Sequence, residues 1–480
     1  MSAVLDSKVE EFQNLIGGEP RHAAARKTFD DVNPADTREI VARFQASGPA
    51  DARAAVEAAA AAFDGWRKTP ISRRAKILQG AADFLEANAE KIAAELTREE
   101  GKAIALAKDE VLRSAQTLRF YAIEGQSFSG ETFPNDDADL LVYSLREPLG
   151  VVSAITPWNF PISIPARKIA PALITGNTVV FKPSSDAPLT GYRLTEAFVR
   201  AGIPKGVLNF ITGSPADVGA EITQNPVVRA ISFTGSTAAG EHIHRSAPLT
   251  TRTQMELGGK NPLIVMDDAD LDLAVDLAIK GGLSLAGQAC TGTSRLIVVS
   301  SVKDLFTQKL VAKIAAMKDI GPLATKKQLE TVLSYIEIGK KEAKLLCGGE
   351  RLAGEKYQHG YFVTPALFDG VRQDMRIARE EIFGPVLALI EASGYEDAIA
   401  KANDTEYGLS AAIATRSQKT MHRFAQDIQS GTVKINRTTT GNLVNAPFGG
   451  LKRSSTSTFR ESGRTGLEFY TQVKTVYQGV

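Results

Sequence analysis

Cys290 is one of only two cysteines in a chain of 480 residues. It lies in the segment SLAGQACTGTSR (284–295), which is rich in small residues. Small neighbours leave room around a sulfur atom, and a nucleophilic cysteine needs such room together with nearby N–H donors. A lone cysteine is more often a buried apolar filler. The segment therefore raises two interpretations of Cys290, a filler and a nucleophile.

Three further segments carry groups that could complete a reaction centre. ITPWNFP (155–161) holds Asn159 between two prolines that fix the backbone. Its amide could donate to a developing oxyanion, and a rigid turn with a packed indole is the alternative. FTGSTAAG (233–240) would open a helix whose free N–H groups favour a phosphate, with simple helix capping as the alternative. MELGGKNP contains Glu256, which is either a solvated charge or a general base in a dry cleft.

Composition and charge narrow the class of protein. A net charge of +1 gives no reason to expect nucleic acid or a membrane surface as a partner. Two cysteines cannot form a disulfide framework, the first residues lack the apolar region of a signal peptide, and no apolar run reaches the length of a membrane span. The five histidines occur without a CxxC or HExxH motif, which argues against a metal site. We expect a soluble, cytoplasmic protein without a metal.

The elements that must position these groups follow an α/β pattern. Residues 50–120 repeat apolar positions at helical spacing and predict two or more helices. From Gly150 the short runs VVSAI, TVVFK, VLNFI and AISFT alternate with helical segments, which predicts βαβ units and a mostly parallel sheet. A second series, from NPLIVM to GTVKIN, predicts another α/β domain that begins near Glu256. The strand-like segments GETFPNDDADLLVYSLREPLG and GLEFYTQVKTVYQ lack a core of their own and are typical of oligomerisation elements.

Taken together, these segments closely resemble the aldehyde dehydrogenase superfamily, in its NAD(P)-dependent, non-phosphorylating branch. TPWNFP, FTGST, MELGGKNP, GQxCT and EEIFGP (380–385) occur in the family's order and at similar spacings, as do VNP near Asn33 and PFGGLKRS (447–454). The motifs are weak singly and specific jointly, and the resemblance covers nearly the whole chain. It implies an aldehyde dehydrogenase-like α/β fold with three parts: a Rossmann-type cofactor domain at 1–129 and 148–255, an α/β catalytic domain at 256–459, and a small β oligomerisation arm at 130–147 and 460–480.

The resemblance also implies roles for individual residues. Cys290 would attack the aldehyde carbon, and Asn159 with the Cys290 backbone N–H would form the oxyanion hole for the thiohemiacetal. Glu256 would activate the water that hydrolyses the resulting thioester, and Lys168 matches a lysine near the family's active site. Lys182 and Ser185 would meet the adenosine ribose. The implied cofactor-binding residues are Thr156, Pro157, Trp158, Lys182, Ser184, Ser185, Gly235, Ser236 (at the pyrophosphate), Leu257, Glu381 (at the nicotinamide-side ribose) and Phe383 (near the ring).

The substrate is suggested by two regions of the sequence. Arg167 matches an arginine that succinate-semialdehyde dehydrogenases use near the substrate carboxylate. Those enzymes usually carry a second arginine where this chain has Ser284, and the loop from Asn436 to Gly463 looks more like enzymes acting on α-ketoglutaric semialdehyde (2,5-dioxopentanoate). We therefore expect oxidation of a carboxylated semialdehyde such as the latter to its acid, with succinate-semialdehyde or broad-specificity aldehyde oxidation as alternatives. A surface ion pair is the alternative for Arg437. The candidate substrate-binding residues are Arg167, Ser284, Arg437 and Phe448.

Cofactor preference and assembly follow from the same resemblance. Ser185 stands three residues after the lysine of the KP motif, where a glutamate suits NAD. A neutral serine close to Lys182 does not repel a 2′-phosphate, so we expect NADP to be preferred and NAD to be accepted. We also expect a homodimer or homotetramer in which the two strand-like segments pair across subunits.

Two other classes of protein fit the sequence less well. A cysteine hydrolase needs a histidine base, and no histidine lies in a persuasive motif. A non-catalytic protein on the same fold would have no need of Cys290, Asn159 and Glu256 together. One departure from the family lies between Met317 and Gly321, where roughly a dozen residues are absent, either as a true deletion or as a missing loop.

Overall fold

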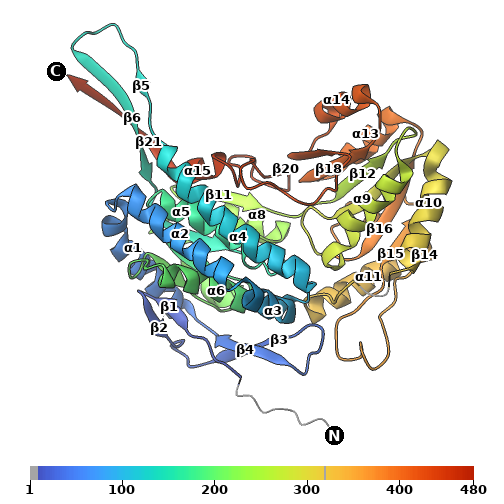
Figure 1. Cartoon of the computed structure of the whole chain (residues 1–480), viewed down its shortest axis with the longest axis horizontal. Helices are drawn as coiled ribbons and strands as arrows, with labels where there is room; N and C mark the ends of the chain where they lie inside the picture. Colours follow the sequence, from blue (N-terminus) through green and yellow to red (C-terminus); the bar gives the residue numbers. More distant parts are fainter. Residues whose placement is uncertain (1–8, 318–319, 480) are drawn as a thin grey trace.

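A computed structural model of the chain describes residues 9–317 and 320–479. Two seven-stranded sheets lie in the two halves of the molecule, and a narrow β arm extends from one of them (Figure 1). Both sheets are largely parallel and are flanked by helices, which confirms the α/β fold expected from the sequence. The expected domain boundaries remain predictions.

The first sheet has the strand order β11-β10-β7-β8-β9-β1-β2, and the five strands from β11 to β9 run parallel. Strand β8 is buried along its whole length, which is why its sequence TVVFK is a nearly unbroken apolar run. The strands are β1 (Asn14–Ile16), β2 (Glu19–Arg21), β7 (Val151–Ile155), β8 (Thr178–Lys182), β9 (Leu208–Phe210), β10 (Val228–Thr234) and β11 (Arg252–Glu256).

Helices cover this first sheet. The segment expected to hold two or more helices contains four, which are separated at three positions: Pro70 caps the start of α2, Asn88 lies between α2 and α3, and Gly101 ends α3. Gly101 has a φ of 92°, and a Cβ there would collide with the Pro322 ring. The helices are α1 (Pro49–Arg67), α2 (Ile71–Ala87), α3 (Ala89–Glu100), α4 (Ile104–Glu124), α5 (Ser163–Ile174), α6 (Pro188–Arg200), α7 (Pro215–Thr223) and α8 (Thr237–Ser246).

The second sheet has the strand order β14-β15-β16-β13-β12-β18-β19. Only the edge strand β14 runs antiparallel. The strands are β12 (Asn261–Val265), β13 (Thr293–Val299), β14 (Lys344–Cys347), β15 (Ala366–Asp369), β16 (Val386–Ala392), β18 (Ser410–Ala414) and β19 (Thr432–Ile435). The helices are α9 (Leu271–Leu283), α10 (Ser300–Ala315), α11 (Lys326–Glu342), α12 (Arg376–Arg379), α13 (Tyr395–Asn403) and α14 (Gln418–Asp427).

The arm is a three-stranded sheet of order β21-β6-β5, built from β5 (Thr132–Phe133), β6 (Leu140–Pro148) and β21 (Thr471–Gly479). The two strand-like segments therefore pair with each other within one chain. Any pairing across subunits would have to use the edge strands of the arm, β21 and β5. The expectation of a strand from Gly466 was wrong at its start. Residues Thr465–Phe469 form the short helix α15, because Leu467 and Phe469 turn into the core below α5.

Smaller elements complete the chain: β3 (Thr28–Val32) pairs with β4 (Ile40–Gln45), β17 (Tyr407–Gly408) pairs with β20 (Leu451–Lys452), and the single turns are η1 (Gly125–Ser127) and η2 (Ser284–Gly287). Within the described ranges, no helix has the length and apolar character needed to cross a membrane. The short connection at 317–321 includes residues 318–319, so this departure from the family lies outside the described residues.

Candidate active site

Three of the four chemistry-bearing segments meet at one edge of the first sheet. They follow the carboxyl ends of β7, β10 and β11, which are neighbours in the sheet. In open parallel sheets this edge is where ligands bind, because loops and helix N-termini converge there. The fourth segment, with Cys290, enters from the second sheet just before β13.

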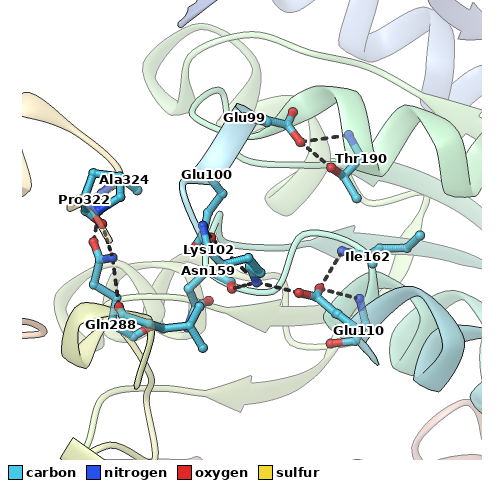
Figure 2. Close-up of polar contacts among 12 residues, drawn as sticks. Glu99, Glu100, Lys102, Glu110, Asn159, Ile162, Thr190, Gln288, Pro322 and Ala324 are labelled. Atoms are coloured by element: carbon cyan, nitrogen blue, oxygen red, sulfur yellow. Dashed lines mark hydrogen bonds and ion pairs between the residues drawn. The ribbon is translucent and has the colours of Figure 1, made fainter. Parts of the chain in front are cut away.

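Asn159 lies in the turn between β7 and α5 and is 2% exposed. Its Nδ2 donates to the backbone oxygen of Gln288 at 3.0 Å, two residues before Cys290. An amide nitrogen carries two hydrogens, so one N–H remains to serve a second acceptor. The Lys102 ammonium donates to the backbone oxygen of Asn159 at 2.7 Å, and this hydrogen bond anchors the backbone of the turn (Figure 2).

The Cys290 loop has an unusual backbone. Leu285 and Ala286 both adopt left-handed conformations, with φ of 54° and 50°. Non-glycine residues rarely adopt this conformation, and it persists where surrounding contacts enforce it. The contacts here come from Gln288, whose side chain donates to the Leu285 oxygen at 3.0 Å and accepts from the Ala324 N–H at 2.9 Å.

A second anchor holds the loop on the other side of the cysteine. Asn261 Nδ2 donates to the backbone oxygens of Cys290 and Gly292, both at 2.9 Å. Gly259 permits this approach, because a Cβ there would lie 2.6 Å from the Cys290 oxygen. The GG of MELGGKNP therefore serves close packing against the cysteine loop.

Burial raises the pKa of the Cys290 thiol to about 12. The positive charge of Arg167 opposes this effect, while the charges of Glu381, Glu256 and Glu461 add to it. At neutral pH the sulfur of this structure is consequently a thiol, and Arg167 is the group that favours its ionisation.

Glu256 ends β11 and is 2% exposed. Within the described chain neither of its carboxylate oxygens has a hydrogen-bond partner. Burial, followed by the charge of Glu461, raises the pKa of Glu256 well above its ordinary value. Gly449 borders the carboxylate, since a Cβ there would lie 2.9 Å from Oε1. A buried carboxyl group with a raised pKa suits a general base.

A buried ion cluster adjoins Glu256. Lys168 Nζ donates to Glu461 Oε1 at 2.8 Å and to Ser232 Oγ at 3.1 Å. Arg167 Nε lies 3.4 Å from Glu461 Oε2, and the guanidinium lies over the Phe448 ring at 5.6 Å. The structure thus brings three residues singled out in the sequence, Arg167, Lys168 and Phe448, around Glu461, which the sequence analysis did not single out.

The residues expected at the adenosine end lie after β8 and β10. Lys182 is buried, its Nζ donates to the Pro183 oxygen at 3.1 Å, and burial lowers its pKa to about 8. Ser185 Oγ donates to the Gly213 oxygen at 3.2 Å, and Ser184 Oγ donates to the carboxylate of Asp186 at 3.2 Å.

Ser236 is the N-cap of α8, and its oxygen accepts from the Ala239 N–H at 3.4 Å. Gly235 admits no Cβ without collision with the Phe233 ring, and Gly240 packs α8 closely on Leu257. The N-terminus of α8 therefore lies at the carboxyl end of β10, and a helix N-terminus at this edge suits the pyrophosphate of a dinucleotide.

Two residues expected at the nicotinamide end, Glu381 and Phe383, line a small pocket beside the Cys290 loop. Glu381 lines it and accepts from the Gly259 N–H at 2.9 Å, and burial raises the pKa of Glu381 to about 7. Phe383 also lines it and packs edge-on against Trp158, with ring centroids 5.5 Å apart. A Cβ at Gly258 would collide with the Glu381 carboxylate, so glycine at this position leaves room for that carboxylate. Of the turn residues, Thr156 is buried and its N–H donates to the Lys182 oxygen at 3.2 Å, while Pro157 and Trp158 are half-buried.

Two expected substrate residues are not joined to this centre. Ser284 and Arg437 are exposed, and in the described chain no hydrogen bond or ion pair links either of them to Cys290 or Arg167. Among the same residues, no cluster of three or more histidine, cysteine, aspartate or glutamate side chains could hold a metal ion.

Glu461, Lys102 and Glu110 were missed by reasoning from the sequence. Glu461 stands in RESG, where nothing distinguishes it from a surface charge. Lys102 follows EEG at the end of a helix, a usual position for a solvated lysine. The signal that identifies all three is burial of a charge, which depends on tertiary packing and is not visible along the chain.

Comparisons with known proteins agree with this geometry. The sequence profile of the Aldehyde dehydrogenase family matches residues 21–476. The chain is 44% identical to the alpha-ketoglutaric semialdehyde dehydrogenase of Bacillus subtilis, over 97% of this chain and 98% of that protein. It is 42% identical to the 2,5-dioxopentanoate dehydrogenase of Saccharolobus solfataricus, over 94% and 96%. Its fold is similar to that of a betaine aldehyde dehydrogenase from Staphylococcus aureus solved in complex with NAD+, at 34% identity and a TM-score of 0.94, covering 97% of this chain and 94% of that one.

Proposed function

The chain belongs to the aldehyde dehydrogenase family, and from that premise we propose that its substrate is a carboxylated semialdehyde, with α-ketoglutaric semialdehyde (2,5-dioxopentanoate) as the first candidate. The reaction is the NAD(P)-dependent oxidation of an aldehyde to its carboxylic acid. The names of the Bacillus and Saccharolobus relatives support this choice of substrate.

In the proposed mechanism, the Cys290 thiol loses its proton to water, its sulfur forms a bond to the aldehyde carbon, and the carbonyl oxygen becomes an oxyanion. The free N–H of the Asn159 amide and the Cys290 backbone N–H donate to this oxygen. A bound nicotinamide supplies the hydride acceptor. Glu256, unpaired and buried, then removes a proton from the water that attacks the thioester, and the C–S bond breaks to release the acid and Cys290.

The observation that supports a carboxylated substrate is the unbalanced positive charge beside Cys290. While Glu256 is protonated, Arg167 and Lys168 share one carboxylate, that of Glu461, which leaves one positive charge. Arg167 Nε has no hydrogen-bond partner within the described chain, and its side chain is 18% exposed. A substrate carboxylate is the natural complement to such a guanidinium.

The test compares aldehydes that differ in this carboxylate. Wild type is expected to prefer α-ketoglutaric and succinic semialdehyde to butanal, and Arg167→Met should lower kcat/KM for the acids by about 10- to 100-fold, because a hydrogen bond to a charged group contributes about 1.5–3 kcal/mol. Activity on butanal should fall by a smaller factor, because for this aldehyde only the effect of Arg167 on the ionisation of Cys290 is lost. Equal losses for acid and neutral aldehydes would contradict the role of Arg167, and a selective loss in Arg437→Met would assign the carboxylate to that side chain instead.

The same test extends to the nucleophile. Cys290→Ala should abolish oxidation of every aldehyde while the dissociation constant of the cofactor changes little. Substantial turnover in this variant would rule out Cys290 as the nucleophile.

For the cofactor, we propose that NADP is preferred and that NAD is accepted. The neutral Ser185 and the buried ammonium of Lys182 favour a 2′-phosphate, while Asp186 nearby opposes it. The ratio of kcat/KM for the two cofactors should shift toward NAD in Ser185→Glu. A wild-type preference for NAD of about tenfold or more would contradict this proposal.

For assembly, we propose a homodimer or homotetramer that uses the β arm. Several large apolar side chains on the arm are exposed in the single chain, and such a set normally becomes covered by a partner. They are Phe133, Leu141, Leu145, Val473 and Tyr477. Light scattering that gives the monomer mass at micromolar concentration would contradict the proposal.

A further inference from the structure

The turn that carries Asn159 is held by a buried ion pair from outside the reaction centre. Lys102 lies between α3 and α4, and its Nζ contacts Glu110 Oε2 at 2.5 Å (Figure 2). Both side chains are almost fully buried, with exposed fractions of 1% and 4%. Burying two charges is costly, and such a pair is kept where its geometry matters or where its loss would leave a lone charge.

The pair holds both ends of the turn. Lys102 Nζ donates to the Asn159 oxygen at 2.7 Å, which is the start of the turn. Glu110 Oε1 accepts from the N–H groups of Ile162 and Ser163 at 3.2 and 3.1 Å, which is where α5 begins. A carboxylate at a helix N-terminus satisfies N–H groups that have no partner within the helix. One ion pair therefore fixes the backbone on either side of the Phe160–Pro161 step.

The line of contacts continues to the nucleophile. Asn159 Nδ2 donates to the Gln288 oxygen at 3.0 Å, and the Gln288 side chain reaches the Pro322 oxygen at 3.4 Å and the Ala324 N–H at 2.9 Å. In Figure 2 these side chains form a continuous row from Glu110 through Lys102 and Asn159 to Gln288. The row joins a helix of the first half of the chain to the loop that carries Cys290.

The charge balance of the cluster supports one ion pair and not a lysine shared by two ionised carboxylates. Glu100 Oε2 lies 3.7 Å from Lys102 Nζ. Burial raises the pKa of Glu100 to about 8, an effect that the charge of Lys102 only partly offsets. At neutral pH Glu100 is therefore mostly protonated, and Glu110 is the counterion of Lys102.

We propose that Lys102 and Glu110 are positioning residues that hold the Asn159 amide where it donates to the oxyanion, an inference that rests on the proposed role of Asn159. They contact neither substrate nor cofactor and act through the turn. A hydrogen-bond donor must be aligned with the developing charge to lower the barrier, and a shift of about 1 Å can cost about 100-fold in rate.

The test is a double-mutant cycle between Lys102→Met and Asn159→Ala. Asn159→Ala should lower kcat by about 10²- to 10³-fold, as is typical of one oxyanion donor. Lys102→Met should lower kcat and the rate of the pre-steady-state burst by about 10- to 100-fold, with KM for the aldehyde and for the cofactor within about threefold. In the Asn159→Ala background the same substitution should lower kcat by less than about threefold, because the donor that it positions is already absent.

Lys102→Met leaves Glu110 buried without its partner and lowers stability, so the cycle is repeated with the double variant Lys102→Met/Glu110→Gln. This variant carries no lone charge but lacks the hydrogen bond to the Asn159 oxygen, and the same loss of kcat is expected. Arg193→Met is the matched control. It breaks a largely buried pair with Glu95, at 2.8 Å, on helices α6 and α3, away from the turn, and should lower the melting temperature without lowering kcat.

The outcomes separate the two proposals. Unchanged kcat in Asn159→Ala overturns the proposed role of Asn159, and this inference with it. If Asn159→Ala is impaired as expected, kcat within about threefold of wild type for the charge-free double variant overturns the positioning role alone. The positioning role is also overturned if Lys102→Met lowers kcat by the same factor in the Asn159→Ala background as in wild type, because Lys102 would then act independently of the amide.

Discussion

Two regions of the reaction centre carry a carboxylate with the same 2% exposure, and the two carboxylates behave in opposite ways. Glu461, in the C-terminal segment, is paired with Lys168 and Arg167. Burial alone would raise the pKa of Glu461, but these cations bring it below its ordinary value. Glu256, at the end of β11, has no partner in the described chain, and its pKa is raised well above the ordinary value.

The difference shows that burial alone does not decide the state of a carboxyl group. The paired Glu461 remains a carboxylate and holds two cations in place. The unpaired Glu256 keeps its proton to a higher pH than an ordinary carboxyl group, because it is buried, and the negative charge of Glu461 adds to this effect. One region thus provides a fixed counterion and the other a titrating base.

The largest effect is expected when the base is removed. Glu256→Gln should lower steady-state turnover by about 10²- to 10⁴-fold, because a positioned general base contributes about that much. The first hydride transfer does not use this group, so a burst of absorbance at 340 nm should persist in stopped-flow measurements. If the burst disappears while cofactor binding is intact, Glu256 acts earlier than proposed.

In the region of Glu461, the loss of one partner is expected to lower the stability of the fold. Lys168→Met leaves Glu461 buried without its main partner and should lower the free energy of unfolding by about 3–5 kcal/mol, as measured by denaturant titration. Lys168→Met/Glu461→Gln removes both charges and should recover much of this loss. If Lys168→Met is as stable as wild type, Arg167 alone is a sufficient partner for the buried carboxylate of Glu461.

Reasoning from the sequence found Glu256 but missed Glu461, for a physical reason. Glu256 sits in a motif whose glycines, Gly258 and Gly259, permit close approach, and this local property can be read along the chain. Glu461 becomes functional only by contact with Lys168, 293 residues away. Pairing over such a distance is decided by packing, which leaves no local pattern.

The same contrast holds for the fold. The parallel strands were predictable because strands such as β8 are buried along their whole length and read as apolar runs. The helix at Thr465–Phe469 was not, because its alternating sequence fits a strand equally well and only the core contacts of Leu467 and Phe469 select a helix.

A smaller effect is expected when the two regions are uncoupled. The negative charge of Glu461 raises the pKa of Glu256, so Glu461→Gln should lower that pKa. Glu256 acts as a base only when deprotonated, and the acid limb of the profile of kcat against pH should therefore move to lower pH. The profile is measured with the ordinary substrate between about pH 5 and 9. A shift of the acid limb to higher pH would contradict the coupling, because the substitution only removes the negative charge of Glu461.

The smallest expected effect concerns Arg167, which belongs to the Glu461 region but acts on the nucleophile. Burial raises the pKa of Cys290 to about 12, and Arg167 is the cation that lowers it. Arg167→Met should therefore raise this pKa further and slow alkylation by iodoacetamide at every pH, because only the thiolate reacts. In wild type the alkylation rate should rise by about tenfold per pH unit between pH 7 and 10 without a plateau, since the thiolate fraction is still small there. Cys347 is half-buried and would contribute a background, so both rates are measured in Cys347→Ser. Faster alkylation in Arg167→Met would mean that access to the sulfur, which the guanidinium and the Phe448 ring restrict, outweighs the charge.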